Sequence, residues 1–122
     1  MREGARPTGL RRLWLATTHT MRGLAACYRS EAAFRQECWL AAVLVPAGLW
    51  LGRSGVERAL LVGSMLVVLI VELLNTGIEL VVDRIGLERH HLSGFAKDVG
   101  SAAVFCSLVL LAATWILVIF FP

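Results

Sequence analysis

The apolar positions of this chain fall into three long stretches that carry almost no charge. Residues 38–52 contain no charged side chain, residues 59–78 contain only Glu72, and residues 99–122 contain none. About 20 apolar residues are needed to cross hydrocarbon as a helix, so the second and third stretches are long enough alone. The first reaches that length when it is extended backward to residue 32. Because only helices and closed barrels satisfy their backbone in lipid, the pattern predicts three transmembrane helices, at about 32–51, 57–82 and 97–120.

An amphipathic segment at about 8–30 precedes the first predicted span. Six apolar residues recur there at helical spacing: Leu10, Leu13, Trp14, Met21, Leu24 and Tyr28. Four arginines lie elsewhere on the helical wheel: Arg11, Arg12, Arg22 and Arg29. A helix with one apolar and one basic face lies in the membrane interface. The sequence therefore predicts an all-α membrane protein, with a surface helix and three spans forming a single domain over residues 1–122.

Composition supports a membrane protein and sets its orientation. The chain of 122 residues is 57% hydrophobic, with a mean hydropathy of +0.71 and a net charge of +3. A soluble domain this small could not bury so much apolar surface. No nucleic-acid-binding motif accompanies the basic residues, so anionic lipid headgroups explain them better. The N-terminal segment and the 83–98 loop hold most of the Arg and Lys residues, which predicts that both are cytoplasmic and that the C-terminus lies outside.

The candidate chemistry is concentrated at the end of the second predicted span. Glu72, Asn75, Glu79 and Asp83 are spaced so that they share one face of a helix. An ionisable residue within a span is by default a functional-site hypothesis. A lone Glu could equally be a neutral or paired packing residue. Four polar side chains on one stripe have no such structural purpose, so we expect them to form a site.

Two further polar groups are expected to face this stripe from the same membrane interface. The first group is Glu31, Arg35 and Glu37, before the first predicted span. Glu31 and Arg35 could also form an ordinary surface ion pair, because they are four residues apart. Lys97, next to Asp98, could simply extend its ammonium group from the membrane to the aqueous interface, but at a helix N-terminus it also makes an anion site suited to a polyphosphate. Converging carboxylates favour Mg²⁺, with Mn²⁺ and Ca²⁺ as weaker alternatives. Zinc is not expected, because the cysteines and His90-His91 lack ligand spacing.

These motifs resemble those of a known family. Glu31-Ala-Ala-Phe-Arg-Gln-Glu37, Glu72-x-x-Asn75-Thr-x-Ile-Glu79-x-x-x-Asp83-Arg-Ile-Gly86 and Ala96-Lys97-Asp98 are similar to the small integral-membrane diacylglycerol kinases of Gram-negative bacteria, over essentially the whole length. The resemblance implies an ATP- and Mg²⁺-dependent kinase that converts diacylglycerol to phosphatidic acid. It also implies a homotrimer in the inner membrane, with a periplasmic C-terminus.

The resemblance further implies roles for individual residues. Glu72 would be the general base, and Glu31 and Glu79 would be magnesium ligands. Besides Glu31 and Glu79, the implied ATP contacts are Arg12, His19, Glu88, His90, Lys97 and Asp98. Besides Glu72, the implied lipid contacts are Arg12, Ala16, Met21, Ala33, Arg35, Arg58, Asn75 and Ser101.

Two other functions are compatible with parts of this pattern. An undecaprenol kinase shares the stripe from Glu72 to Glu79, whereas the Glu31–Glu37 block and the long N-terminal helix favour diacylglycerol as the substrate. A small proton-coupled transporter could use Glu72 as its relay. Such a transporter would not need Lys97-Asp98 or the Glu31–Glu37 block, and it would not transfer phosphate from ATP.

Overall fold

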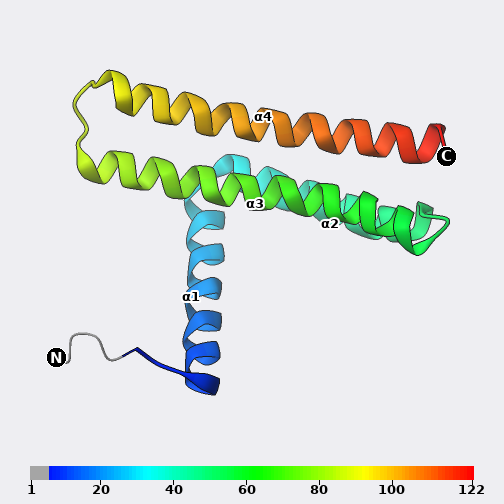
Figure 1. Ribbon diagram of the computed structural model, residues 1–122, viewed down its shortest axis with the longest axis horizontal. Coiled ribbons are helices and arrows are strands. Elements are labelled where there is room, and N and C mark those ends of the chain that lie inside the picture. The colour runs from blue at the N-terminus through cyan, green and yellow to red at the C-terminus, as the bar shows by residue number, and fades with distance from the viewer. Residues whose placement is uncertain (1–5) are drawn as a thin grey trace.

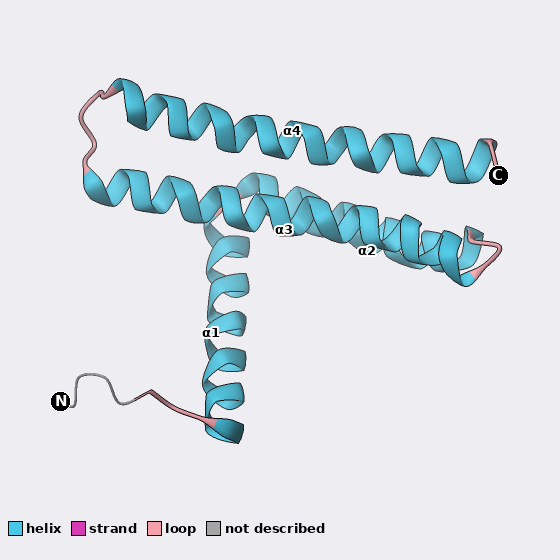
Figure 2. Ribbon diagram, in the orientation of Figure 1, coloured by secondary structure: helices cyan, strands magenta, loops and turns pink. Residues whose placement is uncertain are grey.

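The computed structural model describes residues 6–122, which form helices joined by short connections. In chain order the helices are α1 (Gly9–Ser30), α2 (Ala32–Leu51), α3 (Gly55–Ile85) and α4 (His91–Phe120) (Figure 1). The described residues contain no strand (Figure 2). The predicted all-α fold is therefore confirmed for this part of the chain.

Helix α3 is the centre of a bundle formed with α2 and α4. It packs along both neighbours, and its Leu61, Met65 and Val68 are fully buried. Ala41 of α2 and Leu111 of α4 complete the buried cluster around Met65 and Val68. These positions follow the three- and four-residue spacing of one helical face. Most other apolar side chains point outward, as expected for helices that meet lipid or another protein chain.

The antiparallel pairing of α3 with α4 is fixed at both ends of the bundle. Near the α3–α4 loop, the ammonium group of Lys97 lies 2.8 Å from a carboxylate oxygen of Asp83. At the other end, the indole N–H of Trp115 donates to the carbonyl of Leu61 at 3.1 Å. An indole buried between helices needs such an acceptor, so these contacts hold the two helices in one register.

Arginines bind helix carbonyls at the end of the bundle where α2 joins α3. Arg53 donates to the carbonyls of Val118 and Ile119 at 3.1 and 3.0 Å, and Arg58 donates to that of Leu49 at 2.8 Å. The last carbonyls of a helix have no partner within it. Both arginines therefore satisfy the C-terminal ends of α4 and α2.

The observed helices extend beyond the predicted spans because polar residues cap them outside the apolar stretches. Helix α3 begins at Gly55, after Ser54 accepts a hydrogen bond from the Glu57 N–H at 3.1 Å. Helix α4 begins at His91 rather than near residue 97. Its N-cap is His90, whose Nδ1 accepts from the Leu92 N–H at 3.1 Å.

Two of the helices, α3 and α4, are long and apolar enough to cross a membrane, judged on length and composition. Helix α2 does not meet the same standard, because Arg35 and Glu37 lie in its first two turns. Helix α1 projects sideways from the bundle, across the direction of the other three helices (Figure 1). Its Leu10, Trp14 and Met21 are exposed, which leaves its apolar face open to a membrane.

Candidate functional site

The acidic stripe of α3 lies where α1, α2 and α3 meet. Glu72 is only 6% exposed. Its carboxylate is close enough to those of Glu31 and Glu79 for their negative charges to repel it. The carboxylate of Glu37 on α2 is repelled by Glu72 in the same way. One oxygen of Glu37 is buried without a hydrogen-bond partner in the described part of the chain. Glu31 at the corner, Glu37 of α2 and Glu72 and Glu79 of α3 therefore lie in the same part of the molecule.

Asn75 connects the middle of this stripe to α4. Its Nδ2 donates to Glu79 Oε1 at 3.3 Å. Its Oδ1 is buried against Gly100 of α4 and finds no hydrogen-bond partner among the described residues. The amide thus orients the Glu79 carboxylate while it is itself held between two helices.

Glu31 occupies the corner between the surface helix and the bundle. It is the single non-helical residue between α1 and α2, with φ −114° and ψ 110°, and it is partly buried. Arg35 does not form an ion pair with Glu31 in the described structure. Instead, its Nη1 donates to the carbonyls of Tyr28 and Arg29 at 2.8 and 2.9 Å. A cation at the C-terminal end of a helix is favourable, so Arg35 fixes the corner that carries Glu31.

The corner meets α3 at the level of Thr76, between Glu72 and Glu79. Cys27 is buried there, and its thiol lies 3.9 Å from the Thr76 hydroxyl in hydrogen-bonding geometry. Burial raises the pKa of the Cys27 thiol, so the sulfur keeps its proton. Beyond this level α3 and α4 continue past α1 to their connecting loop (Figure 1). The surface helix therefore divides the stripe, with Glu72 on the bundle side and Glu79 on the loop side.

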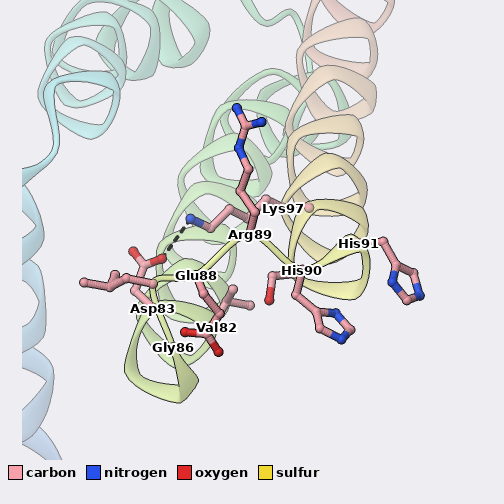
Figure 3. A pocket seen from close by; sticks show the side chains of 11 residues that line it. Val82, Asp83, Gly86, Glu88, Arg89, His90, His91 and Lys97 are labelled. Carbon is pink, nitrogen blue, oxygen red and sulfur yellow. Dashed lines mark hydrogen bonds and ion pairs between the residues drawn. The ribbon is translucent and has the colours of Figure 1, made fainter.

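A pocket of about 420 Å³, with several charged side chains in its lining, surrounds the α3–α4 loop, and its volume is typical of small-molecule sites. Figure 3 shows Lys97 reaching from α4 to Asp83 across this pocket, with Glu88, Arg89 and His90 on the loop. The first turn of α4 adds backbone N–H groups and the positive end of the helix dipole. Lys97, Glu88 and His90, all predicted nucleotide contacts, are thus brought together in one pocket suited to a polyanion.

Other predicted site residues are not in the lining of the loop pocket. Asp98 lines an adjoining groove on α4, which shares His91 and Gly94 with that pocket. Arg58 lies at the opposite end of the bundle, where it binds the Leu49 carbonyl. The remaining ones are exposed on α1, at the start of α2 and on α4: Arg12, Ala16, His19, Met21, Ala33 and Ser101.

Residues 6–122 contain no group of three or more His, Cys, Asp or Glu residues placed to hold a metal ion by themselves. Magnesium does not require such a group, because it takes one or two carboxylates and fills its other positions with water and phosphate oxygens. The mutual repulsion around Glu72 and the orientation of Glu79 by Asn75 suit a hard cation. The carboxylates around Glu72 are therefore chemically suited to Mg²⁺.

The sequence placed Glu37 in the polar set before the first span without giving it a separate role, and it did not predict three contacts of the site. It did not pair Asp83 with Lys97, place Arg89 at the loop pocket, or bring Gly100 against Asn75. The helical stripe pointed to Asp83 but not to its partner. Gly100 gave no signal, because a close approach between two helices is visible only once they are packed.

Comparison with known proteins gives a consistent result. The family model described as prokaryotic diacylglycerol kinase matches residues 18–119. A curated diacylglycerol kinase from Haemophilus influenzae is 46% identical over 114 residues, which cover 93% of this chain and 97% of the relative. One from Pseudomonas aeruginosa is 51% identical over 108 residues, or 88% of each chain. One from Escherichia coli K12 is 46% identical over 108 residues, again 88% of each.

Proposed function

Because the chain belongs to the prokaryotic diacylglycerol kinase family, we propose that it transfers the γ-phosphoryl group of ATP to the hydroxyl of diacylglycerol. The products are phosphatidic acid and ADP. The observation that carries this assignment to particular residues is the buried carboxylate of Glu72, flanked by Glu31 and Glu79 where the surface helix crosses α3. A lipid hydroxyl and a nucleotide phosphate can meet at that level.

The proposed setting is the cytoplasmic face of the inner membrane. In this arrangement α1 lies in the interface, and α2, α3 and α4 cross the bilayer. The exposed apolar side chains of α1 and the apolar lengths of α3 and α4 support it. Glu72 then lies at headgroup depth, whereas Glu79 and the loop pocket face the cytoplasm. Seven residues of helix separate the two acids by about 10 Å, which leaves room for one group to serve the lipid and the other the phosphates.

The loop pocket is the proposed site of the ATP phosphates. Lys97 and Arg89 supply positive charge, and the N-terminus of α4 supplies N–H donors. The ion pair with Asp83 holds the Lys97 ammonium in a defined place at 2.8 Å. His90 uses Nδ1 to cap α4, so its Nε2 is the ring atom left to contact a nucleotide.

Glu31 and Glu79 are the residues that would hold Mg²⁺ between the phosphates and the acidic stripe. The bound ion would neutralise charge that develops on the phosphoryl group. The chain's own contribution is orientation: Asn75 directs a Glu79 oxygen, and Arg35 fixes the corner on which Glu31 lies. In both cases a second side chain limits how the carboxylate can move.

Glu72 is the proposed general base. As the lipid hydroxyl oxygen attacks the γ-phosphorus, the bond to the β,γ-bridging oxygen breaks and ADP leaves. Glu72 accepts the hydroxyl proton and later releases it to water. Its burial keeps solvent from competing for that position. General-base catalysis of this kind typically contributes 10²–10⁴-fold to rate.

A homotrimer is the proposed assembly. Arg12, His19 and Asp98 do not line the loop pocket of their own chain, and Arg12 and His19 are exposed on α1. A neighbouring chain packed against the exposed faces of α3 and α4 would enclose the acidic stripe and give these residues a place at a site. Ala16, Met21, Ala33 and Ser101 would then line the path of the lipid.

The experiment that tests this function is transfer of labelled phosphate from ATP to a lipid by the purified chain in mixed micelles. Diacylglycerol and undecaprenol are offered separately, with and without Mg²⁺. Magnesium-dependent label in phosphatidic acid is expected. Label in undecaprenyl phosphate alone would assign the undecaprenol kinase activity instead. Transfer to neither lipid would remove the kinase proposal and leave proton transport by Glu72 as the alternative.

A further inference from the structure

Gly100 lies at a very close contact between α4 and α3. It is buried, and a Cβ atom at this position would overlap Oδ1 of Asn75 and lie 3.3 Å from its Cγ. The helical glycines Gly63 and Gly77 of α3 behave differently, because a Cβ there would meet no other atom within 4 Å. The absence of a side chain at position 100 is therefore specifically required by the amide opposite it.

The orientation of that amide follows from its two neighbours. Its Nδ2 must face Glu79, since an ionised carboxylate accepts hydrogen bonds and would repel the amide oxygen. Oδ1 consequently faces α4, where it is buried and has no N–H or O–H partner among the described residues. A glycine Cα–H can approach such an oxygen as a weak donor, a contact found at helix–helix interfaces. Any side chain at position 100 would push the amide out of this place.

We infer that Gly100 is a positioning residue that holds the Asn75 amide, and through it the Glu79 carboxylate, in the orientation that binds a divalent cation. The inference rests on the proposed role of Glu79 as a magnesium ligand. Gly100 lies on α4 rather than α3 and has no functional group, but by this inference it influences the affinity of the site for the cation. Partners of metal ligands commonly change metal affinity by 10–100-fold when they are altered.

The test is the Mg²⁺ dependence of diacylglycerol phosphorylation by Gly100→Ala. The midpoint of the Mg²⁺ titration should rise by roughly tenfold, with turnover at saturating Mg²⁺ much less affected. Gly63→Ala is the matched control, since it adds the same methyl group to open space, and its midpoint should not move. Direct Mn²⁺ binding to both variants, followed by electron paramagnetic resonance, gives the same comparison without an activity measurement.

A double variant tests whether the effect passes through Asn75. In an Asn75→Ala background Oδ1 and Cγ are gone, and only Cβ, in ordinary contact at 3.9 Å, remains near the new methyl group. Adding Gly100→Ala should then change Mn²⁺ affinity less than twofold, as expected for non-additivity between contacting residues. The thermal unfolding midpoint should show the same pattern, with Gly100→Ala costing less stability in that background. An equal effect of Gly100→Ala in both backgrounds would mean that it alters helix spacing, and would overturn the inference.

Glu79→Gln separates this inference from the function on which it rests. A raised Mg²⁺ midpoint in Glu79→Gln with an unchanged midpoint in Gly100→Ala would overturn the role of Gly100 alone. An unchanged midpoint in Glu79→Gln would instead overturn the metal-ligand assignment, and the role inferred for Gly100 with it.

Discussion

Glu72 is a carboxylate that packing alone does not explain. Val68 and Met65 fill the core about one and two turns away on the same helix, and both are fully buried. An acid in this position brings its charge next to Glu31 and Glu79, which opposes folding unless the acid is neutral or a cation is bound nearby. At the scale of single residues, this cost makes the acidic stripe a functional feature.

The two proposed metal ligands give a direct prediction at this scale. Glu31→Gln and Glu79→Gln keep the size of each side chain but remove the charge that binds a cation. The Mg²⁺ midpoint of lipid phosphorylation should rise at least about tenfold in each variant, while the fold is maintained. Glu57→Gln is the control, because Glu57 pairs with Arg53 at the far end of the bundle. Unchanged Mg²⁺ midpoints in both Glu31→Gln and Glu79→Gln would show that neither carboxylate is a metal ligand.

The corner between α1 and α2 depends on a contact that the sequence did not predict. The spacing of Glu31 and Arg35 was compatible with a surface ion pair, which the described structure does not contain. Arg35 donates to the last carbonyls of α1, and the indole N–H of Trp39 donates to the Tyr28 hydroxyl at 2.9 Å. Two residues on the next helix therefore determine how the surface helix leaves the bundle.

Replacing Arg35 by Gln should loosen this corner. The variant loses charge-assisted hydrogen bonds, each worth about 1.5–3 kcal/mol. Amide hydrogen exchange in the last two turns of α1 should become faster, while exchange in α3 stays the same. Arg22→Gln provides the comparison, because Arg22 is an exposed arginine on α1, where the exchange is measured. Equal exchange in wild type and Arg35→Gln would show that the corner does not depend on this side chain.

Helix existence was predictable from this sequence, but helix ends and contacts between helices were not. The apolar stretches and the amphipathic period gave the four helices, because those patterns depend on one segment at a time. Helix α4 begins six residues before the predicted span at about residue 97, since it is capped by the ring of His90, which lies outside the apolar stretch. The approach of Gly100 to Asn75 requires the relative placement of two helices, which local patterns do not contain.

A single chain does not assemble every residue expected at the site. Arg12 and His19 are exposed on α1, and Asp98 lines a groove of α4 that adjoins the loop pocket without being part of its lining. Large apolar side chains remain exposed along the bundle, including Ile70 and Leu74 next to the acidic stripe. A charged stripe within a span needs protein around it rather than lipid. At the scale of the whole molecule, these features favour an assembly of several copies.

The corresponding prediction is an obligate homo-oligomer, with three copies. Cross-linking of the purified protein in lipid bilayers, at low ratios of protein to lipid, should give a trimer as the largest abundant product. Kinase activity should follow the fraction of trimer when the protein is diluted with additional lipid. Full activity in samples that contain only monomer would contradict this prediction.

The proposed role of Glu72 as acceptor of the lipid hydroxyl proton is tested by the kinetics of a single variant. Turnover and ATP affinity are determined together for Glu72→Gln in the correctly assembled protein. The amide keeps the shape of the side chain but cannot take the proton, so turnover should fall by at least about 10²-fold while ATP affinity stays nearly unchanged. Near-normal turnover in this variant would contradict the account, because a purely structural acid could be replaced by the neutral amide without loss of catalysis.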